Sequence, residues 1–232
     1  LISDSFFDLI QKIHETSGKR VAILIDEYDK PILDNITKPD IARDVRECLK
    51  SFYSVIKDSD SCVEFCFLTG VTKFSKVSLF SGLNNLEDIT LNPEFATLCG
   101  YTEHDLQTVF QEHLLGLDLP GMKRWYNGYN FLGESVYNPF DILLFLKNRE
   151  FKNYWFETGT PTFLIDLLIK KQFSIPRLES IVSDDSLMNS FDLDCIELEN
   201  LMFQTGYLTI KEVRRMAGEM IYTLVYPNLE VK

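Results

Sequence analysis

The stretch VAILIDEYDKP, Val21–Pro31, places five consecutive apolar residues directly before two carboxylates. Such a run predicts a strand buried on both faces, as in a parallel sheet that helices cover. Asp26 and Glu27 then fall at the carboxyl end of this strand, the edge where open α/β sheets bind ligands. The stretch therefore predicts an α/β fold with a ligand-binding site at this edge.

The residues around this stretch predict its neighbours in the fold. An amphipathic pattern predicts a first helix that begins at Ser3 or Asp4, and apolar residues recur at a helical period over Asp40–Lys57. A second apolar run, Cys62–Leu68, predicts another strand, which leads directly into Thr69. Strand, helix and strand form a right-handed crossover, so the two strands should be parallel and adjacent or nearly so.

The acidic pair has a functional and a structural interpretation. In nucleotide triphosphatases the Walker B strand ends in a carboxylate that holds Mg²⁺, and a second carboxylate orients the attacking water. A polar residue that ends the neighbouring strand senses the γ-phosphate, and Thr69 has that position. The alternative is a solvated strand end at Asp26 and Glu27, with Thr69 as a turn hydroxyl that fixes Gly70.

A phosphate-binding loop of the form G-x-x-x-x-G-K-[ST] is not found in the sequence. The nearest candidate, Gly18–Lys19, has Ile13 where the first glycine should stand and is followed by Arg20. It precedes the acidic strand by two residues, which leaves no helix whose N-terminus could bind phosphate. We therefore predict a turn at Gly18.

Composition limits the classes of partner. The chain has 232 residues, 45% of them hydrophobic, with 18 Phe and 10 Tyr, which suffices for one or two domains with a buried core. Its formal net charge of −12 disfavours a large nucleic-acid interface or binding to an anionic membrane. No apolar run approaches the roughly 20 residues that span a bilayer. Neither nucleic acid nor a membrane is an expected partner of this segment.

The cysteines indicate a reducing compartment. They are odd in number and form no CxxC pair, and the three histidines are not spaced to complete a zinc site with them. We predict a cytoplasmic location and free thiols at Cys48, Cys62, Cys66, Cys99 and Cys195.

From about Tyr101 the pattern becomes helical. Thr102 and Asp105 fit a capping box ahead of a helix. Two further helices are predicted to start at Asn138–Pro139 and Thr160–Pro161, where a capping residue precedes a proline. This region contains an aromatic cluster that could stack on bases or pack between the core and the helical lid, and its acidic setting favours packing. The cluster consists of Trp125, Tyr126, Tyr129 and Phe131.

The last part of the chain predicts a helix followed by a hairpin, as at the end of a winged-helix module. The helix opens within Asp194–Glu197 and closes at Gly206, and the strands Tyr207–Val213 and Met220–Tyr226 join at Ala217–Gly218. The hairpin carries three basic and two acidic residues, which leaves few positive charges to contact DNA phosphates. They are Lys211, Arg214 and Arg215 against Glu212 and Glu219. Packing on a nucleotide-binding core is the favoured role, and DNA binding is the alternative.

A series of motifs resembles the bacterial AAA-ATPase-like family common in Bacteroidales. The series is ILIDEYDKPI, FLTGVTKFSKVSLFSGLNNLEDIT, GYTEHDL, WYNGYNF, YNPF, TGTPTFL, FQTGYLTI and YPNLEV. The resemblance covers nearly the whole chain, and the combination is more specific than any single member. It implies a partial P-loop NTPase core of three layers at residues 1–100, a helical lid at 101–190 and a winged-helix-like module at 191–232.

The resemblance also implies residue roles. Asp26 and Glu27 become the Walker B pair, with Asp26 as the Mg²⁺ ligand and Glu27 as the catalytic carboxylate. Thr69 becomes the sensor, and Lys73 becomes a candidate phosphate-facing cation, for which a solvated lysine is an equal alternative.

Family members carry Walker A upstream of the part that corresponds to Leu1 and often a PD-(D/E)xK nuclease-like domain downstream of the part that corresponds to Lys232. Mg²⁺ and ATP are therefore expected for a longer parent protein, in which hydrolysis drives a conformational change. Residues 1–232 alone are expected to be inactive and without a cofactor. A homo-oligomer is an open possibility, and nucleic acid enters only through the nuclease-like domain. The alternative function is a non-catalytic binding or scaffold module.

Overall fold

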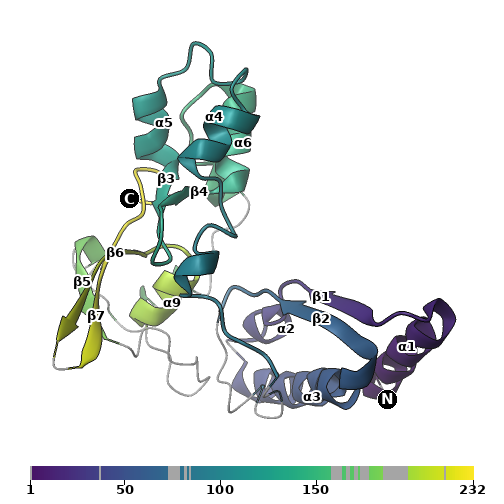
Figure 1. Cartoon of the computed structure of the whole chain (residues 1–232). Helices are drawn as coiled ribbons and strands as arrows, with labels where there is room; N and C mark the ends of the chain where they lie inside the picture. The colour runs from purple at the N-terminus through teal and green to yellow at the C-terminus, as the bar shows by residue number, and fades with distance from the viewer. Residues whose placement is uncertain are drawn as a thin grey trace. The chain divides into compact units, whose positions relative to one another are not determined.

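The computed structural model describes most of the chain as two compact units (Figure 1). The described residues are 2–36, 38–72, 79–80, 83, 85–157, 164–165, 168–169, 172, 178–184, 198–216 and 218–232. Those up to Glu87 belong to the first unit and those from Asp88 onward to the second. The fold is mixed α/β, as predicted. The division into ranges 1–100, 101–190 and 191–232 stays a prediction.

The first unit contains the predicted crossover. Its elements are α1 (Ile2–Ser17), β1 (Val21–Ile25), α2 (Lys30–Leu33), α3 (Pro39–Asp58), a 3₁₀ turn (Asp60–Cys62) and β2 (Val63–Leu68). β1 and β2 pair in parallel, which confirms the prediction, although Cys62 belongs to the 3₁₀ turn rather than to the strand. Gly18 has φ +65° in the turn between α1 and β1, so it is a turn residue as predicted.

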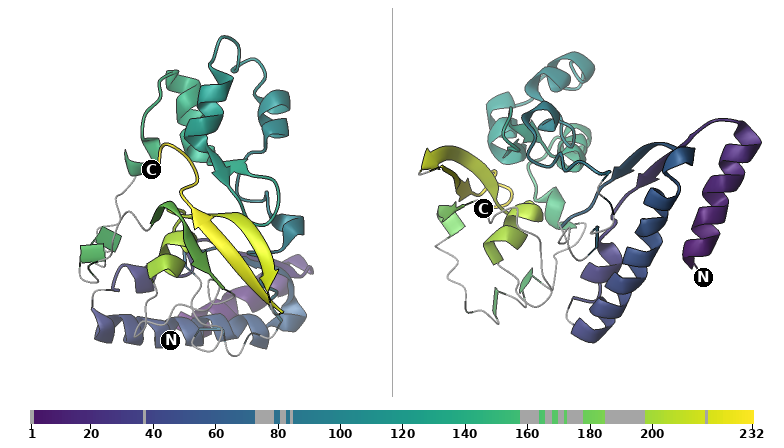
Figure 2. Two further views of the ribbon diagram at one scale, coloured as in Figure 1. Left: turned by 90° about the vertical axis from the view of Figure 1, so that its left-hand side faces the viewer. Right: turned by 60° about the horizontal axis from the view of Figure 1, so that its bottom comes forward.

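Helix packing builds the buried side of this unit. Pro39 is the first residue of α3. Its fixed φ suits a helix, and the N–H that it lacks would have no acceptor within the helix at this position. α1 and α3 contact each other through the stacked rings of Phe6 and Phe52, whose centroids lie 4.4 Å apart. Figure 2 shows α3 running alongside the β1–β2 pair. Ile23 of β1 and Ile56 of α3 are buried in the resulting core.

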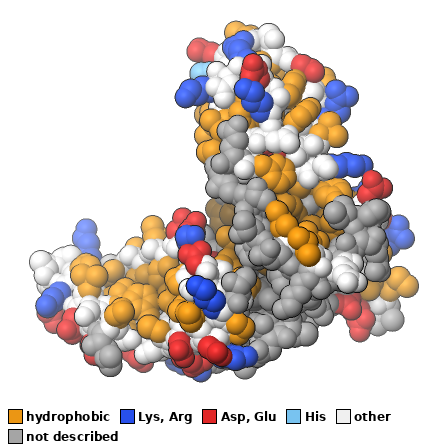
Figure 3. All heavy atoms as spheres, turned by 180° about the vertical axis from the view of Figure 1, so that it is seen from behind, with side chains coloured by type: hydrophobic (Ala, Val, Ile, Leu, Met, Phe, Trp, Pro, Cys, Tyr) orange, Lys and Arg blue, Asp and Glu red, His pale blue; other side chains and the backbone are white. Residues whose placement is uncertain are grey.

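The prediction that the first strand is buried on both faces is wrong. Ile23 is 7% exposed, but its neighbour Leu24 is 71% exposed, and Phe65 of β2 is 54% exposed. Side chains alternate across a strand, so these values mark one covered face and one open face. Within the described residues this sheet has two strands, too few to sit between two helical layers. Figure 3 shows a patch of hydrophobic side chains on the surface of this unit, with charged side chains around it.

The second unit combines short helices with two small sheets. Its elements are a 3₁₀ turn (Pro93–Phe95), α4 (Glu103–Val109), α5 (Leu119–Tyr126), β3 (Asn127–Tyr129), β4 (Val136–Tyr137), α6 (Pro139–Asn148), α7 (Tyr154–Glu157), β5 (Ile181–Ser183), α9 (Leu198–Gln204), β6 (Thr209–Met216) and β7 (Glu219–Val225). The capping box of Thr102 and Asp105 and the Asn138 cap are confirmed. The predicted helix starts at Thr160–Pro161 and Asp194–Glu197 lie outside the described residues.

Trp125 and Tyr126 of the aromatic cluster pack with other rings of the second unit, and the predicted packing between a core and a helical lid stays a prediction. Tyr126 is fully buried, and its ring contacts Phe145 and Tyr154. Trp125 stacks on Phe151 with ring centroids 5.6 Å apart. These rings form part of the core between α5, α6 and α7.

The predicted hairpin is present and is part of a three-stranded sheet. β6 and β7 pair in antiparallel register, and β5, which the sequence did not predict, pairs with the other edge of β7. The guanidinium of Arg214 donates to both carboxylate oxygens of Glu212 at 2.9 Å. Because Arg214 is paired with Glu212, one of the three basic residues of the hairpin is already neutralised and less suited to bind DNA phosphates. Among the helices that the structure describes, none has the length and apolar character to cross a bilayer.

Candidate functional site

The candidate site lies where β1 and β2 end in the first unit. The hydroxyl of Thr69 donates to Oδ1 of Asp26 at 2.5 Å. The Thr69 backbone N–H donates to the carbonyl of Ile25 at 2.9 Å, which continues the parallel pairing past the strands. The structure therefore brings these two predicted residues together, because the carboxyl ends of paired parallel strands meet at one edge.

Glu27 turns the chain sharply after β1. Its φ of +53° lies in the left-handed region, which a glutamate rarely occupies and which costs about 1–2 kcal/mol. Its backbone N–H donates to Oδ1 of Asp26 at 2.9 Å, so the turn is tied to the same oxygen that accepts from Thr69. The Glu27 side chain is exposed and free to meet a ligand at this edge.

Lys73, the fourth predicted site residue, lies outside the described residues. The site is therefore built here from Asp26, Glu27 and Thr69 with the backbone that holds them.

Asp29 is the residue at this edge that the sequence interpretation missed. It is 0% exposed, and its carboxylate accepts three hydrogen bonds from the loop after β2. The donors are Val71 N–H at 3.1 Å, Thr72 N–H at 2.5 Å and the Thr72 hydroxyl at 2.7 Å. A buried carboxylate needs such donors, since desolvation is otherwise costly. Two features of the sequence could have pointed to Asp29. It lies three residues after Asp26, and two threonines, Thr69 and Thr72, follow the second strand.

Gly70 permits the close approach of the two strand ends. A Cβ at this position would lie 2.5 Å from Cε1 of Tyr28 and 2.6 Å from Oδ1 of Asp29. Any side chain would therefore push the loop after β2 away from the Tyr28–Asp29 segment. The glycine is required by this contact.

The oxygens at this edge suit Mg²⁺ only in part. Carboxylate and hydroxyl oxygens are the ligands that Mg²⁺ prefers, and proteins hold it through one or two carboxylates together with substrate phosphates. Asp26 and Glu27 offer that number of carboxylates. Within the described residues no group of three or more His, Cys, Asp or Glu side chains is placed to hold a metal ion. The residues therefore fit a magnesium ion shared with a phosphate ligand.

A separate pair of buried carboxyl groups lies in the second unit. Asp141 of α6 is 0% exposed and Glu230 is 2% exposed. Neither oxygen of Asp141, nor Oε2 of Glu230, receives a hydrogen bond from a donor that the structure describes. Burial and the adjacent Glu230 carboxyl raise the pKa of Asp141 to about 8, and burial raises the pKa of Glu230. Both shifts favour the protonated form of these carboxyl groups.

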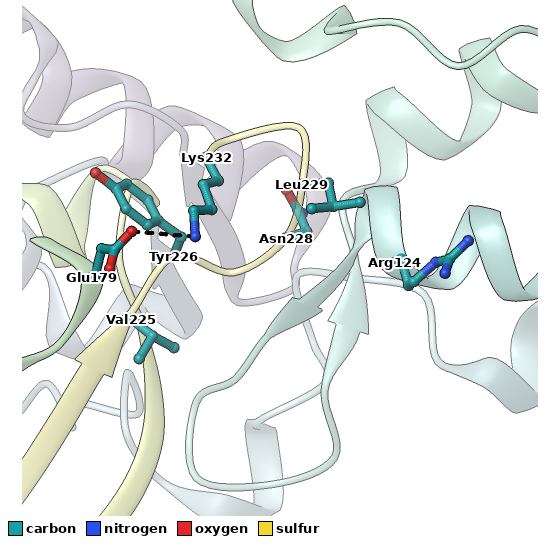
Figure 4. Close-up of a pocket in the computed structure, with 7 residues that line it drawn as sticks. All are labelled: Arg124, Glu179, Val225, Tyr226, Asn228, Leu229 and Lys232. Carbon is teal, nitrogen blue, oxygen red and sulfur yellow. Dashed lines mark ion pairs between the residues drawn. The ribbon is translucent and has the colours of Figure 1, made fainter. Parts of the chain in front are cut away.

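The second unit also has an open pocket of about 430 Å³ (Figure 4). Two of its lining residues, Lys232 and Glu179, form an ion pair at 3.4 Å. The guanidinium of Arg124 points away from that pair. The two cations do not converge on one point, and Asp26, Glu27 and Thr69, the predicted site residues that the structure describes, do not line the pocket.

The comparison with protein families finds a match within the first unit. Residues 2–80 match the profile of a family described as "Predicted AAA-ATPase". This range contains β1, α3 and β2 and therefore the Asp26–Thr69 edge.

One relative matches along nearly the full chain. A protein of Azotobacter chroococcum mcd 1, described as "Uncharacterized protein in vnfD 5'region", is 56% identical over 227 residues. The alignment covers 98% of this chain and 44% of that protein, so the chain spans less than half the length of this relative. No solved structure matches the chain.

Proposed function

We propose that this chain is part of a P-loop ATPase whose Walker B edge is the carboxyl end of β1 and β2. The contact between the Thr69 hydroxyl and Asp26 Oδ1, at 2.5 Å, carries the proposal. A carboxylate and a hydroxyl that meet at the ends of parallel strands are suited to a magnesium-bound triphosphate. The profile match of residues 2–80 supports the same class.

Within this proposal each residue has its own role. Asp26 holds Mg²⁺ through the carboxylate that also accepts from Thr69. The exposed Glu27 carboxylate accepts a hydrogen bond from the attacking water and orients it, and the Thr69 hydroxyl senses the γ-phosphate. When bound, Mg²⁺ neutralises charge on the β- and γ-phosphates. Lys73 belongs to the proposal as a phosphate-facing cation.

The remaining parts of the proposed ATPase lie elsewhere in a longer protein. We expect the phosphate-binding loop and the third layer of the core from sequence outside residues 1–232, together with a PD-(D/E)xK nuclease-like domain. The α9–β6–β7 segment is proposed as a winged-helix-like module that packs on the core, since its Arg214 is already paired with Glu212. Hydrolysis would then drive a conformational change in the full-length protein.

Calorimetric titration with Mg-ATP tests the binding part of this proposal. We expect the full-length protein to bind with a Kd in the micromolar range, and residues 1–232 alone to give no saturable heat up to about 1 mM, because most triphosphate contacts come from the phosphate-binding loop. Titration with Mg²⁺ alone is the control, and we expect no binding to either form.

Two results would contradict the proposal. Absence of Mg-ATP binding by the full-length protein would favour the non-catalytic scaffold instead. Micromolar binding by residues 1–232 would show that the Asp26–Thr69 edge holds nucleotide without a separate loop, against the division of roles proposed here.

A further inference from the structure

The loop after β2 is attached to the segment after β1 at several points besides the Thr69–Asp26 contact. Asp29 accepts from Val71 N–H, from Thr72 N–H and from the Thr72 hydroxyl, and both Asp29 and Thr72 are buried. All three donors belong to residues that directly follow Gly70. A single carboxylate therefore organises the whole turn that begins at Thr69.

Tyr28 fastens the same turn from its other side. Its backbone N–H donates to the Thr69 carbonyl at 2.9 Å, and its hydroxyl donates to the Thr72 carbonyl at 2.7 Å. The Tyr28 carbonyl accepts in turn from the Tyr53 hydroxyl of α3 at 3.0 Å. The turn is thus bound at its first and last residues and linked to α3 through the buried Tyr53.

These contacts determine where the Thr69 hydroxyl lies. The Thr69 carbonyl accepts from Tyr28 N–H and the Thr69 N–H donates to the Ile25 carbonyl, and the turn that follows Thr69 is bonded to Asp29 through Val71 and Thr72. Because Gly70 has no side chain, the turn packs directly against the Asp29 carboxylate. If the turn lost its bonds to Asp29, the Thr69 backbone bonds would remain, but the Thr69 side chain would lose one of the constraints that keep its hydroxyl on Asp26.

We propose that Asp29 is a positioning residue of the candidate site, which holds the Thr69 hydroxyl on the Asp26 carboxylate by binding Thr72. This inference rests on the proposed ATPase function. Asp29 touches neither nucleotide nor water in this role, because it is fully buried. It acts through the turn, so its loss slows turnover more than it weakens binding of ATP.

The test uses the full-length protein with Thr72→Val and Thr72→Ser. Valine keeps the shape of threonine and removes only the hydroxyl that donates to Asp29, whereas serine keeps the hydroxyl. We expect T72V to lower the ATPase kcat about tenfold with KM for ATP within about twofold of wild type, and T72S to retain wild-type kcat within about twofold. The matched control is Thr108→Val, since Thr108 is exposed and its hydroxyl bonds its own helix.

In a second variant, Asp29→Asn, an NH₂ group replaces one of the two carboxylate oxygens that accept from Val71 N–H and Thr72 N–H. Because two donors cannot bond each other, D29N should lower kcat more than T72V does. Thermal unfolding of every variant separates misfolding from mispositioning. Unchanged kcat in folded T72V and D29N would overturn the inference, and so would an equal loss in T72S. No hydrolysis by the wild-type protein would overturn the proposed function itself, and this inference with it.

Discussion

Replacement of Glu27 by glutamine is expected to lower the ATPase kcat of the full-length protein by about 10²–10⁴-fold, the usual contribution of a positioned general base. The amide keeps the size of the side chain and the left-handed backbone at φ +53° but cannot accept the proton of the attacking water. Asp26 and Thr69 stay in contact, so Mg-ATP binding should be retained. A filter or spin-column assay should therefore recover the variant with bound ATP, while phosphate release is nearly abolished.

The matched control is Glu64→Gln. Glu64 is an exposed glutamate of β2, in the same sheet, and its partner is Arg20 at 3.1 Å with both side chains exposed. Exposed ion pairs contribute little to stability, so E64Q should hydrolyse ATP at the wild-type rate. Wild-type phosphate release by E27Q would remove Glu27 from the catalytic role, whereas equal losses in both variants would indicate a general effect of charge on this sheet.

That Asp26 and Thr69 lie at the same edge of the sheet was predictable from topology, whereas their direct contact was not. Two apolar runs joined by a helix must be parallel, and their carboxyl ends then meet. This prediction does not depend on the conformation of the loops that follow the strands. By contrast, the Asp29–Thr72 bonds depend on the path of the turn after Gly70, which a pattern of apolar and polar residues does not specify.

Burial was harder to predict than secondary structure. The apolar run of β1 has the composition of a strand covered on both sides, but exposure of Leu24 depends on how many strands and helices surround it. β5 was missed for a related reason, since Ile181–Ser183 is short and is defined by its pairing with β7. Local pattern predicted the helix caps at Thr102 and Asn138, where the hydrogen bonds are made within a few residues.

Replacement of Asp141 by asparagine is expected to stabilise the second unit at high pH by about 2–3 kcal/mol. The pKa of Asp141, raised to about 8 from its ordinary 3.8, corresponds to roughly 6 kcal/mol at about 1.4 kcal/mol per pKa unit, and relaxation of the buried site should reduce this figure by about half. The amide of D141N can donate to Glu230 without a titrating proton. Neutral and polar groups around the pair remain in place, including Tyr129 of β3, Tyr126 of α5, Tyr154 of α7 and Asn228.

The sign of the pH effect follows from proton binding. Because the folded-state pKa of Asp141 is raised, the folded unit holds more protons than the unfolded chain between about pH 4 and pH 8. The stability that this proton supports is complete below pH 4 and is lost as the pH rises through about 8. D141N lacks this loss, so its stability curve should diverge from the wild-type curve over the same interval.

Tryptophan fluorescence isolates this effect, since the chain has two tryptophans, Trp125 and Trp155, and both belong to the second unit. Urea unfolding from pH 4 to pH 9 should show the smallest difference in stability between wild type and D141N at pH 4, a difference that grows as the pH rises, and the largest gap at pH 8 and above. Glu134→Gln, which removes an exposed carboxylate of the same unit, should follow the wild-type curve. Parallel curves for wild type and D141N would mean that Asp141 and Glu230 do not share a proton, because a shared proton must be released as the pH rises.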